Sequence, residues 1–180
     1  APVQKAAERL AGLAAAEVRQ GDGLEPIGPG QVDVVCIAGI SGRLMARILA
    51  DGEETLAEVS RLVLQPLCNE RDLREWLMLN GWRLTAESIV EERGRQYDTL
   101  VASHGDGAAP YAGGEIPALL EMGPLLSVNP TEAFHRKWRQ KLTHLRVVAG
   151  GRRRSGDFDA ADETDALIAA VETTLAGGRP

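Results

Sequence analysis

Residues 33–42 read DVVCIAGISG, and the fold class is inferred first from this segment. The run from Val34 to Ala38 is apolar throughout, which is typical of a strand buried on both faces of a parallel sheet. A glycine-rich turn follows at residues 39–42, and apolar residues then return at helical spacing, at Leu44, Ile48 and Leu49. The stretch therefore predicts a strand, a tight turn and a helix, which is how a βαβ unit begins.

The flanking segments extend this pattern in both directions. Upstream, we expect a helix at residues 4–12 and a short strand at residues 16–20, closed by Gly21-Asp22-Gly23. Downstream, residues 61–65 predict another strand, ended by Pro66, and residues 69–80 predict a helix capped by Gly81. Residues 83–92 and 95–103 flank Arg93-Gly94 and predict an antiparallel hairpin.

The last third of the chain predicts helices. Apolar residues recur every three to four positions from Phe134 to Leu145 and again from Ile168 to Leu175, so two amphipathic helices are expected, paired antiparallel around a loop at residues 150–157. The alternation of strands and helices before them indicates an α/β fold with a doubly wound sheet. We therefore expect an α/β domain at residues 1–115 and a helical domain at residues 116–180.

Charge is distributed very unevenly along the chain. The net charge is −6, but residues 130–154 hold eight basic side chains against Glu132 alone, which leaves −13 on the remainder. Such a basic segment on an acidic body indicates a surface for RNA or another polyanion, although a solvated helix face is the plainer alternative. The candidate RNA-binding residues are Arg136, Lys137, Arg139, Lys141, Arg152, Arg153 and Arg154.

Several classes of protein are disfavoured by composition. Cys36 and Cys68 are the two cysteines, without metal-ligand spacing, so neither a disulfide framework nor a metal site is expected. Apolar runs fall short of the roughly 20 residues that a membrane span needs. We expect a cytoplasmic protein without a membrane or metal partner, and the sequence leaves its oligomeric state open.

Three turns are candidate ligand sites, because ligands of such sheets bind beyond the carboxyl ends of the strands. Asp22 and Gly23 could border a base through a carboxylate and a bare backbone, or form an ordinary polar turn. Residues 38–42 offer small side chains and backbone amides at a helix start, where Ser41 could simply cap the helix. Gln65, before Pro66, could orient a base or tie down its own turn.

A set of motifs occurs in a fixed order along the chain. QGDGL is at 20–24, IAGISG at 37–42, LVLQP at 62–66, LREWL at 73–77, NGW at 80–82, EERGRQYDTLVA at 91–102, GPLL at 123–126 and FHRKW at 134–138. Together they resemble the bacterial tRNA (adenine-22, N1) methyltransferases. The resemblance covers nearly the whole chain and depends on the ordered set rather than on any one motif.

The resemblance implies a Rossmann-like domain that binds S-adenosyl-L-methionine, followed by a coiled-coil-like tail that binds tRNA. It implies methyl transfer to N1 of a tRNA adenine, and thus a role in tRNA processing. By motif match, Asp22 and Gly23 would border the adenine of the cofactor. Ala38, Gly39 and Gly42 would line the space where methyl group and target base meet, and Gln65 and Pro66 would lie near that base. Gly39, Gln65 and Pro66 are the expected catalytic residues.

Two features depart from the family pattern. The family usually reads IAGMGG, whereas this chain has Ile40 and Ser41, and the serine adds a side chain where the family has none. The family's first strand, glycine-rich cofactor loop and following acidic residue would precede Ala1, so we expect a chain without its cofactor-loop segment. We expect such a chain to bind S-adenosylmethionine poorly, which calorimetry would test, and its strand at Val34 to have an unpaired edge.

Two other functions remain open on the sequence. A different Rossmann-fold nucleotide-dependent enzyme, such as a reductase, would need a GxGxxG loop, which this sequence lacks. A non-catalytic RNA-binding protein of the same fold would explain the altered IAGISG motif. A methylation assay on tRNA separates the second alternative from the enzyme.

Overall fold

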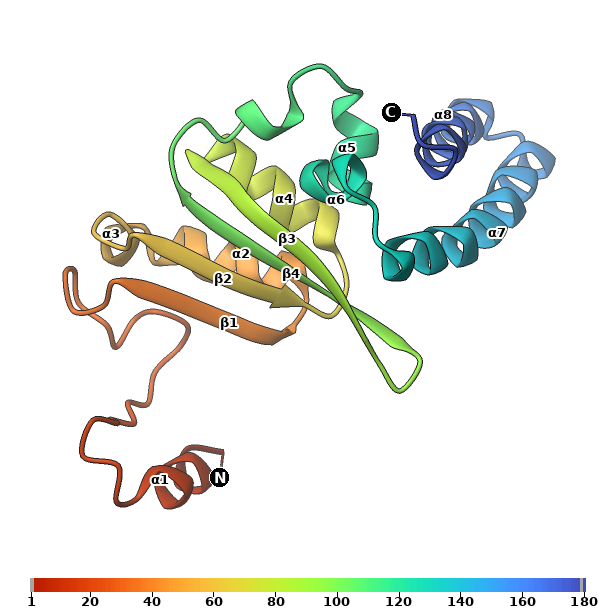
Figure 1. Cartoon of the computed structure of the whole chain (residues 1–180). Coiled ribbons are helices and arrows are strands. Elements are labelled where there is room, and N and C mark those ends of the chain that lie inside the picture. The colour runs from red at the N-terminus through yellow and green to blue at the C-terminus, as the bar shows by residue number, and fades with distance from the viewer. Residues whose placement is uncertain (1, 179) are drawn as a thin grey trace.

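The computed structural model describes residues 2–178 and 180, and it contains one mixed four-stranded sheet (Figure 1). Its strands are β1 (Val34–Ile40), β2 (Arg61–Pro66), β3 (Trp82–Glu92) and β4 (Arg95–His104), in the order β1-β2-β4-β3. β1 and β2 are parallel, whereas β4 runs antiparallel to both of its neighbours. The strands expected at residues 34–38, 61–65, 83–92 and 95–103, with the parallel pair and the hairpin, are thereby confirmed.

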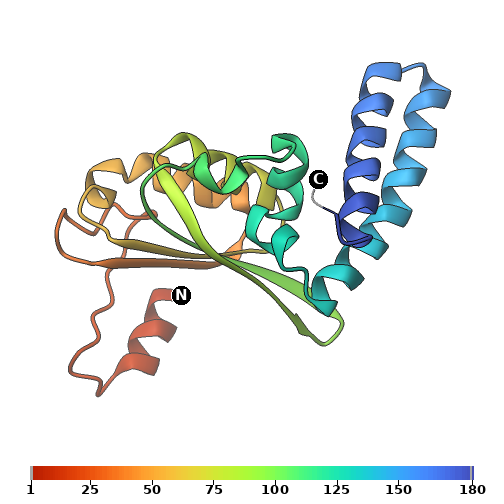
Figure 2. The ribbon, with the colours of Figure 1, turned by 45° about the horizontal axis from the view of Figure 1, so that its top comes forward.

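Helices α2 (Gly42–Asp51) and α4 (Glu70–Leu79) cover one face of the sheet, and the short α3 (Glu53–Leu56) follows α2 (Figures 1 and 2). Their inward side chains form the main core with those of the strands, and fully buried leucines come from α2, β2, α4 and β4 (Leu49, Leu62, Leu64, Leu73, Leu77, Leu100). This core fixes the carboxyl ends of β1 and β2, where the candidate site lies.

The expectation that β1 is buried on both faces is wrong. Val35 is buried, but Val34 is 49% exposed, and Cys36 and Ala38 are exposed as well. The reason is topological, because β1 is an edge strand and α2 covers only the face to which Val35 points. Among the described residues, one backbone edge of β1 therefore has no strand beside it.

The N-terminal segment is only partly as expected. Helix α1 (Pro2–Leu10) forms, but residues 16–20 have no regular secondary structure, so the strand predicted there is wrong. A strand needs a partner, and in Figure 1 this segment lies apart from the sheet. Arg19 ties it instead to the following loop, with its guanidinium donating to the carbonyl oxygen of Pro26 and to the side chain of Gln31.

The C-terminal part is helical, as predicted. After a 3₁₀ turn (Ala109–Tyr111), it consists of α5 (Ile116–Met122), α6 (Pro124–Val128), α7 (Glu132–Ser155) and α8 (Phe158–Leu175). α7 and α8 pack side by side as an antiparallel pair, called here the helical hairpin (Figure 2). The loop expected at 150–157 is wrong in extent. α7 continues to Ser155, and Gly156 ends it with a φ of 83°, a left-handed conformation that glycine adopts without strain.

A second core joins the helical hairpin to α5 and α6. Phe134 and Trp138 of α7 are buried there with Val171 of α8, Met122 of α5 and Ile89 of β3. Helix α5 takes part in both cores, because Leu119 and Leu120 belong to the main one. The helical part is thus packed firmly onto the sheet, and the boundary at residues 115/116 stays a prediction.

Candidate functional site

The parallel pairing of β1 and β2 brings most of the expected site residues together. Ala38 lies opposite Gln65, and Ile40 lies opposite Pro66, with an irregularity in register at Gly39 between them. The carboxyl ends of the two strands meet at this edge, as the ligand-binding rule for α/β sheets requires. The expected catalytic residues Gly39, Gln65 and Pro66 are therefore neighbours.

Gly39 opens this edge to solvent. Its φ is +81°, which favours glycine, and a Cβ added there would meet no heavy atom within 4 Å. The bare backbone at this position leaves space in which a flat group could approach the main chain. This is the kind of cradle that was expected from the motif IAGISG.

Gly42 has a different role from the one expected. Its amide donates to the carbonyl oxygen of Cys68 at 2.8 Å, and the amide of Leu67 donates to that of Ile40 at 2.9 Å. A Cβ on Gly42 would lie 2.2 Å from the carbonyl oxygen of Asn69. The missing side chain of Gly42 thus makes room for the loop after β2. We call these backbone contacts the loop clamp, since they join the turn after β1 to residues 67–69.

Two polar side chains of the site form hydrogen bonds with nearby backbone groups. Gln65 Nε2 donates to the carbonyl oxygen of Pro66 at 2.9 Å, which holds its amide over the turn. Ser41 Oγ accepts from the amide of Leu44 at 3.3 Å, so it caps α2, as its plainer reading predicted. Gln65 Oε1 has no hydrogen-bond partner in the described part of the chain and is available to a ligand.

Asp22 and Gly23 do not join this edge. They line a separate cavity of about 390 Å³ whose other walls, among the described residues, are Leu24, Glu25 and the middle and end of α2 (Arg47, Ile48, Asp51). Leu24 is buried against Gly52 at the end of α2, and Thr55 Oγ1 of α3 donates to the carbonyl oxygen of Ile27 at 2.6 Å, so the loop is held on both helices. Neither Gly39 nor Gln65 lines this cavity, so a cleft shared by Gly23, Gly39 and Gln65 stays a prediction.

Lys137 was expected to bind RNA, but its side chain is buried and paired within the protein. Its side chain is 7% exposed, and its ammonium donates to both carboxylate oxygens of Asp98 at 2.7 Å and to Glu70 at 3.1 Å. A phosphate on the surface could not reach this ammonium without displacing those partners. The run of basic residues does not show which of them face inward, and Lys137 lies on the inward side of α7.

Two further members of that set are also engaged within the protein. Lys141 Nζ lies 4.7 Å from the centre of the Trp138 ring, and burial together with the charge of Lys137 lowers the pKa of Lys141. Arg152 donates to the carbonyl oxygen of Ala160 and to Thr164 Oγ1, which joins α7 to α8. Both side chains would have to give up contacts within the protein to bind a phosphate of RNA.

The exposed arginines of α7 are left as the basic surface. We call them the arginine stripe, and its members are Arg136, Arg139, Arg146, Arg153 and Arg154. Carboxylates partner three of them, since Arg136 pairs with Glu91, Arg146 with Glu172 and Arg153 with Asp165. Among the described residues, Arg139 and Arg154 have no acidic partner and are the most available to a phosphate.

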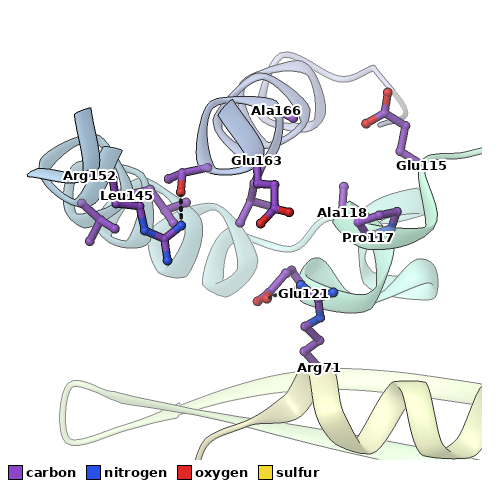
Figure 3. Close-up of a pocket in the computed structure, with 12 residues that line it drawn as sticks. Arg71, Glu115, Pro117, Ala118, Glu121, Leu145, Arg152, Glu163 and Ala166 are labelled. Carbon is purple, nitrogen blue, oxygen red and sulfur yellow. Dashed lines mark hydrogen bonds and ion pairs between the residues drawn. The ribbon is translucent and has the colours of Figure 1, made fainter. Parts of the chain in front are cut away.

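A larger cavity of about 510 Å³ lies between α4–α5 and the helical hairpin (Figure 3). In Figure 3, Glu115, Pro117, Ala118 and Glu121 face Glu163 and Arg152 across it, with Arg71 below. Both arginines have protein partners, Glu121 for Arg71 and Thr164 for Arg152. No local sequence pattern predicts this cavity, because its walls come from separate helices, α4, α5, α7 and α8.

Sequence reasoning also missed a buried ion cluster next to the site. Arg74 is fully buried, its Nε donates to Glu87 at 2.8 Å, and its Nη2 donates to Asp98 at 3.3 Å. Lys137 and Glu70 complete the cluster through Asp98 and Lys137, respectively. A signal was present, since Arg74 lies between Leu73 and Leu77 on the inward side of its helix.

Within residues 2–178 and 180, no group of three or more His, Cys, Asp or Glu side chains is placed to hold a metal ion. None of the helices described is long and apolar enough to cross a membrane.

Comparison with known proteins decides the family. The sequence model of the tRNA (adenine(22)-N(1))-methyltransferases matches residues 2–170. The chain belongs to this family. The tRNA (adenine(22)-N(1))-methyltransferase of Bacillus subtilis (strain 168) is 42% identical over 131 residues, which are 73% of this chain and 55% of the relative. The chain thus spans about half the length of this curated member of the tRNA (adenine(22)-N(1))-methyltransferase family.

Solved structures agree with this assignment. A Streptococcus agalactiae protein of the NADB-Rossmann superfamily superposes with a TM-score of 0.82 at 30% identity, over 97% of this chain and 75% of that one. Streptococcus pneumoniae Sp1610 in complex with S-adenosyl-L-methionine superposes with a TM-score of 0.80 at 32% identity, over 97% and 76% of the two chains. The expected Rossmann-like sheet with a helical tail is confirmed.

Proposed function

We propose that this chain acts in methyl transfer from S-adenosyl-L-methionine to N1 of adenine 22 in tRNA, in the cytoplasm. The observation that carries the proposal is the open backbone at Gly39 beside Gln65 and Pro66, in a chain of this family. Membership of the family supports the proposed reaction. The open backbone at the carboxyl ends of β1 and β2 supports the proposed location of the site.

The edge fits the methyl-donor end of the cofactor. A Cβ at Gly39 would occupy empty space, so Ala38 and Gly39 present backbone and one methyl group where a sulfonium and a base must approach closely. When bound, S-adenosylmethionine supplies an electrophilic methyl group. Asp22 and Gly23 belong to the separate cavity on α2 and are not part of the site proposed here.

Gln65 would orient the target base. Its Nε2 is held by the carbonyl oxygen of Pro66, which directs the free Oε1 as an acceptor for an exocyclic amine such as that of adenine. Adenine N1 carries a lone pair, so the reaction needs no strong base. The chain's contribution is then to position a base that has left its stack.

The arginine stripe would hold the tRNA through its phosphates. Exposed guanidiniums along one helix match a run of backbone phosphates, and such contacts weaken steeply as salt rises. Arg139 and Arg154 contribute most in this proposal, because their charges are not neutralised by neighbouring carboxylates.

Complementation tests the proposed reaction. The whole open reading frame that contains this chain is expressed in a bacterium whose own adenine-22 methyltransferase gene has been deleted, and 1-methyladenosine in purified tRNA is measured by mass spectrometry. Its return in tRNAs with adenine 22, but not in a tRNA with guanine 22, is the expected result. Bound tRNA without any 1-methyladenosine would instead favour a non-catalytic RNA-binding protein.

A further inference from the structure

Lys137 lies where the helical hairpin meets the sheet. It is in the second turn of α7, and its ammonium contacts Asp98 of β4 and Glu70 of α4. A second ion pair joins the two parts nearby, between Arg136 and Glu91, but both of its side chains are substantially exposed. The buried contact is the less screened of the two, because its side chains are 7% and 18% exposed.

Glu70 brings this contact to the edge of the candidate site. It is the first residue of α4, directly after Asn69, whose φ of 59° is a left-handed conformation. The carbonyl oxygen of Asn69 packs on Gly42, and the preceding residues form the loop clamp. A short, closely packed path therefore runs from Lys137 through Glu70 and residues 67–69 to the turn at Gly39–Gly42.

The rest of the ion cluster keeps Lys137 in place without Glu70. Asp98 accepts from Lys137 through both oxygens, and Arg74, bound to Glu87 and to the carbonyl oxygens of Leu120 and Glu121, supports Asp98 from the other side. Asp98 thus holds the ammonium through two contacts, and Glu70 accepts the third. The particular effect of this third contact is on the position of Glu70 and of the loop before it.

We propose that Lys137 is a positioning residue that fixes the loop at residues 67–69, and with it the loop clamp, against the helical hairpin through Glu70. The consequence for catalysis rests on the proposed function. If tRNA binds along the arginine stripe, this contact sets the distance and angle between the bound RNA and the edge at Gly39 and Gln65.

Amide exchange in the 180-residue chain without RNA tests the positioning role. Leu67 and Gly42 donate the two hydrogen bonds of the loop clamp, so their amide protons report its opening. Glu70→Gln should speed exchange at both amides at least roughly fivefold, because a charged hydrogen bond that restrains the loop is lost. Glu75→Gln removes an exposed carboxylate from the next turn of α4, and Glu91→Gln removes the exposed ion pair. Both controls should stay within about twofold of wild type.

Equal exchange in Glu70→Gln and in the two controls would overturn the proposal. Should Glu70→Gln fail to fold, Glu70→Asp, which keeps the charge but shortens the side chain, is measured in its place and should speed exchange in the same direction. The proposed function fails separately, if no tRNA binds to wild type, since the exchange measurement needs no RNA.

In a protein that methylates tRNA, Glu70→Gln should affect kcat and leave the Kd for tRNA nearly unchanged. Glu70→Gln leaves the arginine stripe intact, so we expect the Kd for tRNA to stay within about twofold while kcat falls at least roughly fivefold. A raised Kd with unchanged kcat would contradict the role assigned to Lys137 and Glu70.

Discussion

Lys137 Nζ lies 2.7 Å from each carboxylate oxygen of Asp98, and both side chains are almost completely buried. Removing one partner of a buried pair leaves an uncompensated charge, so Lys137→Ala should lower the free energy of unfolding by about 3–5 kcal/mol. Urea-induced unfolding measures this loss. Arg139→Ala, two residues further along the same helix but exposed and without an acidic partner among the described residues, is the control and should cost less than about 0.5 kcal/mol. Similar losses in both variants would show that Lys137 is a surface residue.

Gly42 and Gly39 should respond differently to an added methyl group. Gly42→Ala places a Cβ against the backbone of Asn69, which cannot move without breaking the loop clamp, so we expect a loss of about 2–3 kcal/mol or more. Gly39→Ala meets open space and should cost about 1 kcal/mol, from its positive φ alone. Thermal unfolding monitored by circular dichroism compares the two. The reverse order would contradict the packing described at this edge.

Gly39→Val should remove activity while the protein still folds, at a loss of stability caused by the positive φ of this position. A branched side chain would fill the space that the bare backbone leaves beside Gln65, where we propose that the methyl donor and the base meet. The complementation assay should then yield no 1-methyladenosine, although circular dichroism shows folded protein. Wild-type levels of the modified base in this variant would remove Gly39 from the proposed site.

Arg139 and Arg154 should carry a large share of the salt-dependent affinity for tRNA. Replacing either by Ala should weaken binding and reduce the slope of log K against log salt by about 1, the value expected for one lost phosphate contact. Fluorescence anisotropy at several salt concentrations measures both quantities. Arg61→Ala is the matched control, because this exposed arginine begins β2, far from the helical hairpin in Figure 1. An equal effect of the control would argue against the arginine stripe.

Glu70 should make stability depend on pH in the acid range. Burial alone would raise the pKa of Glu70, but the charges of Lys137 and Lys141 lower it to about 2. Because the folded pKa lies below the ordinary value of about 4.3, the ionised carboxylate stabilises the fold above about pH 5, and this contribution is lost as pH falls toward 2. Urea unfolding at several pH values should show wild type losing up to about 3 kcal/mol more than Glu70→Gln over this range. Parallel pH profiles of the two proteins would contradict this assignment.

The elements of the fold were largely predictable, because their signals are local. The hairpin at Arg93-Gly94 and the strand-turn-helix at residues 33–51 follow from short-range patterns, and the structure contains both. The strand expected at residues 16–20 failed, since a strand depends on a neighbour that no local pattern specifies. The pairing of Ala38 with Gln65 was predictable only because parallel strands align their carboxyl ends.

The electrostatic part of the site was less accessible to sequence reasoning. Lys137 resembles its basic neighbours in the sequence, but its partners Asp98 and Glu70 lie 39 and 67 positions away. Similarly, nothing local to Asp22 indicates that its loop packs on α2 through Leu24. Charge patterns indicate which residues could bind an anion, whereas tertiary contacts decide which of them remain free to do so.

The length of α7 gives its base a disproportionate influence on its tip. The helix has 24 residues and is therefore about 36 Å long, and Arg154 lies about 25 Å along its axis from Lys137. A tilt of about 10° at the base would displace the tip by about 4 Å, more than the length of a hydrogen bond. The rigidity of the buried contact at Lys137 therefore determines how reproducibly the arginines near the C-terminal end of α7 are placed against the phosphates of bound RNA.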